Sequence, residues 1–370
     1  MAPILPHLDR ILDLARWAPS GDNTQPWRFK ILGDEHIRVQ GSYTQGDKGR
    51  VVYDLDGHST QLAVGALLET IVIAASTEGR TATILRRPDA LETHLLFDVD
   101  IHFEPASIAP DPLVPYIEDR VVQRRSMSTS PLSAEQRQAL ADSLPAGYTI
   151  AWHEGLAQRW KIAKLLFDSA KIRLTIREAY EVHKDVIEWG AKYSIDRIPG
   201  KAVGVDPVTE FFMRWVMHSW ERVEFFNTYL LGDFPPRLQL DLIPGLRCGA
   251  QFALLAPTPP ASLDDYLAAG RAMQRFWLTA SRLGWFIQPE MTPLIFARYH
   301  RAERRFTDPH RQAKQTALAA LARAGAINQR LEKIFGAESL SRIVFMARIG
   351  FGPKPVARSE RKPLEALYLG

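Results

Sequence analysis

The chain has 370 residues, with 46 Lys and Arg against 42 Asp and Glu, so its formal net charge is +4. Hydrophobic residues make up 46% and charged residues 24%, a composition that excludes disordered and fibrous proteins. The length predicts two units of ordinary domain size, or one large fold built twice. A charge this weak gives no electrostatic footprint for nucleic acid, and we expect no nucleic-acid partner.

The cysteine content and the apolar stretches exclude several further classes. The only cysteine is Cys248, so no disulfide can form within the chain, and no Cys/His cluster predicts a metal site. We therefore expect a reducing compartment, the cytoplasm, and no metal. The N-terminus has no basic segment followed by an apolar one, so no secretory signal is expected. The longest apolar stretches, near 62–76 and 247–257, are shorter than the ~20 residues of a membrane helix, and we expect no membrane partner.

The hydrophobic pattern of the first part of the chain predicts helices and strands in alternation. Periodic apolar residues favour helices, and alternating ones favour strands. Prolines 105, 110, 112 and 115 form the best boundary between domains in the chain. The predicted elements before it are helices at 9–17 and 61–79 and strands at 27–32, 36–40 and 95–103.

The second part is longer and richer in helix. Ser133 and Gln136 form a helix-start pattern in which each side chain can cap the other residue's backbone. Residues 190–245 are broken by prolines and glycines, around an aromatic helix at 208–231. The other predicted elements are helices at 115–124, 133–143, 158–189, 263–284 and 311–335 and strands at 148–153, 247–256 and 343–349. Together the two parts predict an α+β fold.

The two strongest predicted helices share small residues at a constant spacing. Gly65 pairs with Gly270, and the Ala75/Ala280, Ser76/Ser281 and Gly79/Gly284 pairs have the same separation of 205 residues. Small residues allow helices to pack closely. The match indicates an internal duplication, although coincidence between two alanine-rich helices is the alternative.

The most distinctive local feature is the segment from Pro19 to Trp27. Pro19 ends a helix, Gly21 frees the backbone, and Ser20 and Asn23 offer hydrogen-bonding groups. Such a turn can be purely structural or can contact a flat heterocycle. The segment resembles the Pro-Ser-x-x-Asn-x-Gln-Pro-Trp motif of the FMN-dependent nitroreductase family.

Three further segments resemble the same family, so that the likeness extends over nearly the whole chain. They are Arg124–Ser128, similar to the family's Arg-x-Ser element; 283–292, similar to its Leu-Gly…Pro segment; and 347–364, similar to its C-terminal strand and basic tail. In ordinary members the Arg-x-Ser element precedes the turn in one short chain, and FMN lies between two subunits. Here the turn comes first.

The inverted order implies one composite FMN site. Residues 1–112 form a first nitroreductase-like half and residues 113–370 a second, with a lid insertion at 190–245. The resemblance therefore implies the fused, single-chain type of the family. Its two related halves would form an internal pseudo-dimer within a monomer, with one FMN per chain.

The resemblance also implies roles for individual residues. Arg124 and Arg361 would bind the phosphate, whereas Arg120, one helical turn earlier, has no assigned role. Ser128 stands where a second cation is usual, so phosphate binding would be weaker unless Arg125 or Lys362 compensates. The remaining implied cofactor-binding residues are Ser126 and Ser128 toward the phosphate or ribityl chain, Pro289, Met291 and Thr292 toward the N5 edge, and Pro19, Ser20, Gly21 and Asn23 toward the ring.

The function implied is an FMN-dependent oxidoreductase that passes hydride or electrons to a small acceptor, with NAD(P)H as the candidate donor. No side-chain acid or base is evident, and no Rossmann, P-loop, HExxH or GxSxG signature is present. Two alternatives remain: a protein that sequesters flavin without turnover, and a flavin dehydrogenase of a biosynthetic pathway. The aromatic helix either fills core or forms part of the lid; the candidate pocket residues there are Tyr193, Arg197, Phe212 and Trp215.

Overall fold

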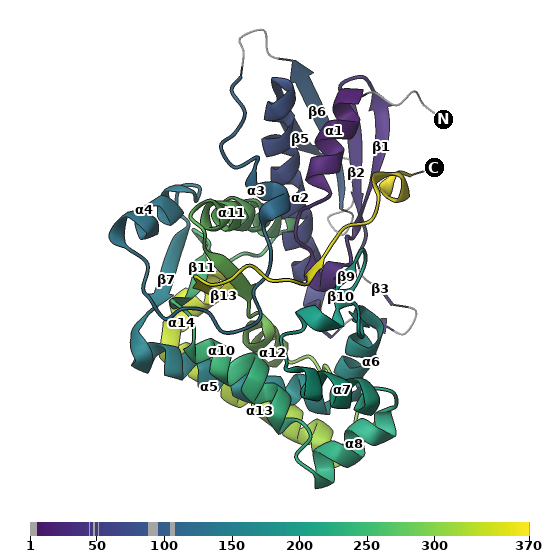
Figure 1. The fold of residues 1–370 in the computed structure, drawn as a ribbon, viewed down its shortest axis with the longest axis vertical. Coiled ribbons are helices and arrows are strands. Elements are labelled where there is room, and N and C mark those ends of the chain that lie inside the picture. The colour runs from purple at the N-terminus through teal and green to yellow at the C-terminus, as the bar shows by residue number, and fades with distance from the viewer. Residues whose placement is uncertain are drawn as a thin grey trace.

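The structure is a computed structural model that describes residues 6–43, 45–46, 49–50, 52–87, 95–103 and 108–369. Pro105 of the predicted boundary lies outside the described residues, as do residues 1–5. Two antiparallel four-stranded sheets, one near each end of a central pair of helices, form the framework (Figure 1). The predicted mixture of helix and sheet is confirmed.

The first sheet has the strand order β1-β2-β6-β5, with every neighbouring pair antiparallel. Its apolar face packs on helices α1 and α2 in one buried cluster. Helix α2 begins where the Asp54 carboxylate accepts hydrogen bonds from the backbone N–H groups of Ser59 and Thr60. The elements are α1 (Pro6–Ala15), β1 (Trp27–Gly33), β2 (His36–Gly41), α2 (His58–Ala75), β5 (Arg80–Arg86) and β6 (Leu96–Phe103), with short pieces η1 (Gly21–Asn23), β3 (Gln45–Gly46), β4 (Gly49–Arg50), η2 (Leu55–Gly57) and η3 (Ser76–Glu78).

The second sheet has the order β12-β13-β11-β7 and is also antiparallel throughout. It packs on helix α11, which starts with a reciprocal cap between Ser262 and Asp265. The predicted cap between Ser133 and Gln136 is present at the start of α4. The elements are α3 (Tyr116–Asp119), α4 (Ala134–Asp142), β7 (Thr149–His153), β11 (Ala250–Leu255), α11 (Leu263–Arg282), β12 (Phe286–Pro289) and β13 (Ile343–Gly350).

Helices α2 and α11 pack against each other between the two sheets, and they meet at the paired glycines. A Cβ atom on Gly65 would lie 2.2 Å from the Leu267 carbonyl oxygen, and one on Gly270 would lie 2.2 Å from that of Leu62. Each would also lie 3.0 Å from the Cα atom of the other glycine. Only glycine at both positions permits this approach of the two backbones.

The second sheet carries two long insertions that form the lower part of the molecule in Figure 1. One joins β7 to β11, and the other joins β12 to β13. Their helices share a buried cluster beneath the sheet. The first contains α5 (Gly155–Thr175), α6 (Arg177–Val186), β8 (Ile187–Glu188), β9 (Tyr193–Ser194), β10 (Ile198–Pro199), η4 (Gly200–Ala202), α7 (Pro207–Val216), α8 (Trp220–Tyr229), α9 (Phe234–Arg237), the π-helical turn η5 (Leu238–Leu242) and α10 (Ile243–Leu246); the second contains α12 (Thr292–Arg301), α13 (Lys314–Phe335) and α14 (Ala337–Arg342).

The C-terminal tail crosses from the second sheet to the first, as the yellow trace in Figure 1 shows. Strand β14 (Arg358–Ser359) pairs with β9, and η6 (Leu364–Leu367) follows. Leu364 and Leu367 enter the core of the first sheet, and the Leu369 N–H donates to the Phe29 carbonyl oxygen at 2.7 Å. The tail therefore joins the two parts of the molecule.

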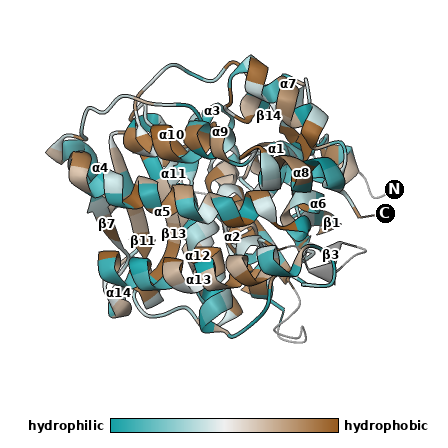
Figure 2. Ribbon diagram, turned by 90° about the horizontal axis from the view of Figure 1, so that it is seen from below, coloured by the Kyte–Doolittle hydropathy of each residue, from teal (hydrophilic) through white to brown (hydrophobic). Residues whose placement is uncertain are grey.

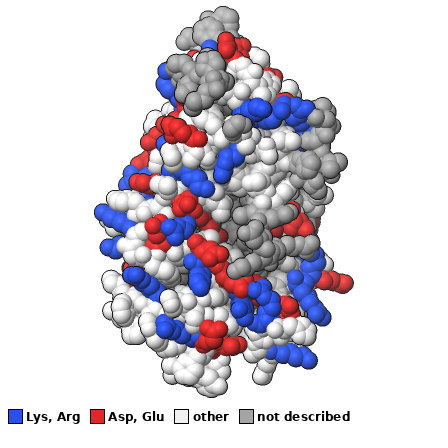
Figure 3. All heavy atoms as spheres, turned by 90° about the vertical axis from the view of Figure 1, so that its right-hand side faces the viewer, with Lys and Arg blue, Asp and Glu red and all other residues white. Residues whose placement is uncertain are grey.

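One buried helix and the charge distribution on one face bear on the expected partners. The segment Leu55–Glu78 is long and apolar enough to cross a membrane, but 89% of its most apolar window is buried within the protein. Its apolar run is thus longer than predicted, because it serves as a core helix. On the face in Figure 3, acidic and basic side chains are interspersed, and neither forms a continuous patch.

Most predicted elements are confirmed, with a few informative differences. The predicted helix 158–189 is two helices, α5 and α6, because Ile176 adopts an extended conformation between them. The aromatic helix 208–231 is likewise two, α7 and α8. Helix 115–124 shortens to α3, since the chain runs extended from Arg120. Strands β5 and β12 were not predicted.

Candidate functional site

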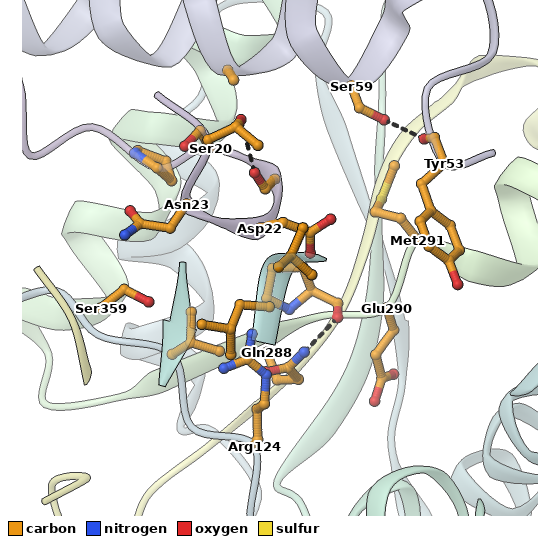
Figure 4. Close-up of a pocket in the computed structure, with 18 of the residues that line it drawn as sticks. Ser20, Asp22, Asn23, Tyr53, Ser59, Arg124, Gln288, Glu290, Met291 and Ser359 are labelled. Atoms are coloured by element: carbon orange, nitrogen blue, oxygen red, sulfur yellow. Dashed lines mark hydrogen bonds between the residues drawn. The ribbon is translucent and has the colours of Figure 1, made fainter. Parts of the chain in front are cut away.

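A cavity of about 500 Å3 lies where the first part, the second part, the insertion and the tail meet. The Pro19–Pro26 turn forms one wall, and Met291, Glu290, Gln288 and Arg124 face it (Figure 4). Nine of the twelve predicted cofactor residues line this cavity: Pro19, Ser20, Gly21, Asn23, Arg124, Pro289, Met291, Thr292 and Arg361.

The other three predicted residues, Arg125, Ser126 and Ser128, do not line the cavity. Arg125 is exposed and donates from Nη2 to the carbonyl oxygens of Lys201 and Val205, at 3.4 and 3.5 Å. Ser128 donates from Oγ to Ser130 Oγ at 2.9 Å. This segment runs without helix beside β12 and β13, and successive side chains of an extended chain point to opposite sides. Alternation accounts for Arg124 pointing inward and Arg125 outward, but not for Ser126 and Ser128, which are also absent from the cavity lining. The three residues therefore do not lie where the predicted phosphate contacts require them.

The turn that carries the motif has an unusual backbone. Asp22, Asn23 and Gln25 have φ values of 51°, 60° and 50°, although none is glycine. Such conformations cost about 1 kcal/mol or more each and persist only where surrounding contacts enforce them. Here Ser20 Oγ accepts from the Gln25 N–H at 3.0 Å, and the Gln25 side chain bonds the Ile195 carbonyl and the Lys362 N–H, each at 2.8 Å.

Asn23 fastens this turn to the tail and to the insertion. Its Nδ2 donates to the carbonyl oxygens of Glu360 and Arg197, at 3.1 and 3.4 Å, and its Oδ1 accepts from Arg361 Nη1 at 2.9 Å. In Figure 4 the amide points away from Asp22. The side chain predicted to reach a cofactor ring is therefore committed to the protein, and Asn23 acts by positioning the turn.

One end of the cavity is strongly cationic. Arg120, Arg358 and Arg361 line it, and their guanidinium groups donate to backbone carbonyls such as those of Trp17 and Glu118. Within the described part of the chain, none has a carboxylate within 4.0 Å. Burial lowers the pKa of all three, to about 9 for Arg120. Neighbouring arginines lower the pKa of Arg120 and Arg361 further, whereas nearby carboxylates oppose the lowering for Arg358. Burying unpaired cations is costly, so this end is suited to an anion.

The opposite side of the cavity holds paired buried charges. Arg348 donates from Nη1 to Glu290 and from Nη2 to the Arg124 carbonyl oxygen, at 2.6 Å. Arg173 bonds Asp241 at 2.7 Å. Burial raises the pKa of Glu290 to about 7, against the opposing effect of Arg348. These pairs bring together strand β13, the insertion and the start of α12.

Tyr53, from the first part of the chain, and His183, from the insertion, form the wall of the cavity next to these charge pairs. The Tyr53 hydroxyl lies 3.0 Å from His183 Nε2, and the rings stack with centroids 5.7 Å apart. Burial and the nearby Arg173 lower the pKa of His183 to about 3, so its ring is neutral at pH 7. We therefore assign Nε2 as the acceptor and the tyrosine hydroxyl as the donor.

Hydrogen-bonding groups without partners gather around the cavity. The N–H groups of Met291 and Thr292, at the start of α12, form no hydrogen bond with the described chain. Six of the fifteen buried side-chain atoms that lack a partner in the described chain belong to cavity residues. Unsatisfied buried groups are rare in folded proteins and indicate a ligand or water. The six atoms are Arg120 Nε, Trp277 Nε1, Gln288 Oε1, Glu290 Oε2, Arg348 Nε and Arg358 Nε.

The expected lid, residues 190–245, contributes to the cavity through four small or aliphatic residues and Asp241, and not through its aromatic helices. Phe212 and Trp215 are 54% and 46% exposed, and neither they nor Tyr193 and Arg197 line the cavity. These four predicted pocket residues are corrected. Hydrophobic residues along α7 lie on the outside of the molecule, where they appear brown in Figure 2. The lining residues from this segment are Ile198, Ala202, Val203, Leu240 and Asp241.

Residues 5–63 match the family model of the nitroreductase family. The match contains α1, the turn and the first two strands. Among solved structures, the chain is similar to a nitroreductase-like family protein from Bacillus cereus, with 13% identity over 69% of this chain and 94% of that chain and a TM-score of 0.33. No curated protein sequence matches the chain.

Several cavity residues escaped sequence reasoning. Arg120 has no assigned role in the family motif, yet its guanidinium is buried at the cationic end. Arg358 lies in the tail, three residues before Arg361. Its closeness to a predicted phosphate ligand could have marked it as a further candidate. Asp22 occupies a variable position of the turn motif, and no local pattern distinguished Glu290.

Proposed function

We propose that this chain is an FMN-dependent oxidoreductase of the nitroreductase type. The observation that carries the proposal is the single cavity shared by the Pro19–Pro26 turn, Arg124, the Pro289–Thr292 segment and Arg361. These elements come from regions far apart in sequence, and the family resemblance assigns all of them to one flavin. The nitroreductase match over residues 5–63 covers the turn itself.

We further propose that the chain is an internal pseudo-dimer of two related halves. Aligning the chain order of the two sheets pairs β1 with β7, β2 with β11, β5 with β12 and β6 with β13, and both sheets then have the same spatial order. In each, the long helix α2 or α11 stands between the second and third strands. In a dimer with two-fold symmetry, a residue on the axis contacts the same residue of the partner. Gly65 and Gly270, which occupy matching positions in the two helices, contact each other in this way. A monomer would then contain the interface that separate subunits supply elsewhere.

The residues present fit FMN. Arg120 and Arg358, with Arg124, would bind the phosphate, because guanidinium groups form strong bonds to phosphate oxygens. The Met291 and Thr292 N–H groups at the positive end of α12 would donate to acceptors of the ring. When bound, the flavin supplies hydride and electron transfer, and the protein orients it and excludes water. Arg361, whose five bonds go to the protein, would hold the turn in place.

The electron donor and acceptor form part of the same proposal. A small acceptor would enter the cavity after the flavin has been reduced, with NAD(P)H as the donor. The chain carries one cysteine, buried and with a pKa raised to about 12 by burial, which suits work in the reducing cytoplasm.

A second candidate function is flavin sequestration without turnover. It is favoured by residues 190–245, the expected lid, which supply five cavity-lining residues and so cover part of the site. A lid that stays closed would keep nicotinamide from the flavin.

Purification and absorbance spectroscopy test these proposals together. We expect a flavin spectrum with one FMN released per chain on denaturation, and bleaching on anaerobic addition of NAD(P)H. Bleaching with dithionite but not with NAD(P)H would instead support sequestration. A protein that neither contains nor binds FMN would overturn the proposed function, and two FMN per chain would overturn the composite site.

A further inference from the structure

Asp22 differs from every other carboxyl group that lines the cavity. Its carboxylate forms no hydrogen bond and no ion pair within 4.0 Å to any described residue. By contrast, Asp54 accepts from Ser59 and Thr60, Asp241 pairs with Arg173, and Glu290 pairs with Arg348. Asp22 lies in the middle of the view in Figure 4, between the turn and Arg124.

The turn holds Asp22 in this position at a cost in stability. Its φ of 51° is left-handed, and so are those of Asn23 and Gln25, which the tail and the insertion hold in place. Strained backbone enforced from several sides is typical of functional sites. A carboxyl group held inside a cavity without a protein partner adds a second cost, because burial disfavours its charged form.

The other charged groups around Asp22 are bonded to protein partners, and the Asp22 carboxyl group is left without one among the described residues. Burial raises its pKa, and the charge of Arg124 opposes that rise. Tyr53 is the other titratable group that interacts with it, and its hydroxyl is committed to His183. Beyond these lie the two ion pairs, Arg173–Asp241 and Arg348–Glu290, whose charges are already compensated.

We propose that Asp22 donates the proton to an acceptor that is reduced in this cavity. This inference rests on the proposed function, in which reduced flavin is the source of the hydride. The hydride brings two electrons and one proton; the O–H bond of Asp22 breaks, and its proton forms a new O–H or N–H bond on the acceptor. The carboxylate that remains takes a proton back from water. The acceptor is therefore one that gains a proton on reduction, such as a quinone, in which hydride and proton together give the hydroquinone and no leaving group is released.

The first test uses FMN-free protein and measures unfolding by denaturant from pH 4 to pH 8. Because the pKa of Asp22 is higher in the folded state, ionisation lowers the stability of the wild type as the pH rises through its unfolded and folded values. Asp22→Asn removes this penalty, so we expect a higher unfolding midpoint than wild type at pH 8 and an equal one at pH 4. The matched variant Asp54→Asn loses bonds to Ser59 and Thr60 and should lower the midpoint. A lower midpoint for Asp22→Asn at pH 8 would mean that Asp22 is a structural residue and would overturn the proposal.

The second test compares two acceptors with the FMN-loaded protein. A benzoquinone must gain a proton, whereas ferricyanide accepts one electron and no proton. With Asp22→Asn we expect quinone turnover to fall roughly 100-fold or more, with the flavin dissociation constant and ferricyanide turnover unchanged and partial recovery in Asp22→Glu. Equal quinone turnover in Asp22→Asn and wild type would overturn the role of Asp22 while leaving the proposed function intact. Loss of flavin binding in the wild type would overturn both.

Discussion

The two four-stranded sheets share a strand order but differ in what lies between their strands. In the first, a two-residue turn joins β1 to β2; in the second, residues 154–249 separate the equivalent pair β7 and β11. Residues 290–342 likewise separate β12 from β13. The first sheet supplies the strained turn with Asp22, and the second supplies the arginines, Glu290 and the covering insertion. The two sheets thus have one strand order in common, whereas the long insertions belong to the second sheet alone and make the cavity between the two parts asymmetric.

The largest effect is expected where the two halves touch. Alanine at Gly65 would gain up to about 1 kcal/mol from helix propensity, but its Cβ atom would clash with the Leu267 carbonyl oxygen. We expect Gly65→Ala and Gly270→Ala each to lower the free energy of unfolding by about 3 kcal/mol, measured by denaturant titration. Gly33→Ala, where no atom lies within 4 Å of the new Cβ, is the control. Unequal losses in the two helices would break the proposed equivalence of the halves.

The next effect distinguishes the cationic end of the cavity from the neighbouring surface. Arg358→Met retains bulk and removes one charge-assisted bond to the phosphate, worth about 1.5–3 kcal/mol, so FMN should bind roughly ten- to a hundredfold more weakly. Arg125→Met removes an arginine that also contacts carbonyl groups but lies outside the cavity. Its FMN dissociation constant, measured by fluorescence quenching, should stay within twofold of wild type. If Arg125→Met weakens FMN binding as much as Arg358→Met, the sequence motif located the phosphate better than the cavity does.

The smallest effect concerns His183, which joins the insertion to Tyr53 of the first half. Its pKa is about 6.5 unfolded and about 3 folded, so its contribution to stability is complete above pH 6.5 and is lost as the pH falls toward 3. Between pH 7 and pH 5 we expect the wild type to lose about 1–2 kcal/mol through this residue. His183→Gln should show a correspondingly shallower pH dependence, and His310→Gln, at an exposed position, should show no change. Parallel pH curves for wild type and His183→Gln would exclude a buried neutral histidine at this position.

Local sequence was sufficient to predict the elements with strong signals. Helix α2 carries a nearly continuous apolar run, α11 carries apolar residues at helical spacing, and the Ser133–Gln136 cap acts within one helical turn. The motif turn was located because proline ends a helix, glycine permits a tight turn, and asparagine favours turns within its own segment. Strand β5 was missed because its sequence, Arg-Thr-Ala-Thr-Ile-Leu-Arg, alternates weakly, and the break at Ile176 was missed because no proline or glycine marks it.

The sequence by itself determined the mixed fold, through patterns that act over a few neighbouring residues, and its resemblance to a known family pointed to nine residues of the cavity wall. Only the tertiary structure decided which side chains remain free to act. Arg124 and Arg125 are adjacent in sequence, yet one faces the cavity and the other solvent. Asn23 is fully bonded because the tail, more than 300 residues later, returns to it, whereas Asp22 beside it is left without a partner. Hydrogen bonds and charge pairs depend on distances in space, and these are set by the packing of the two sheets, the insertions and the tail and not by any local pattern.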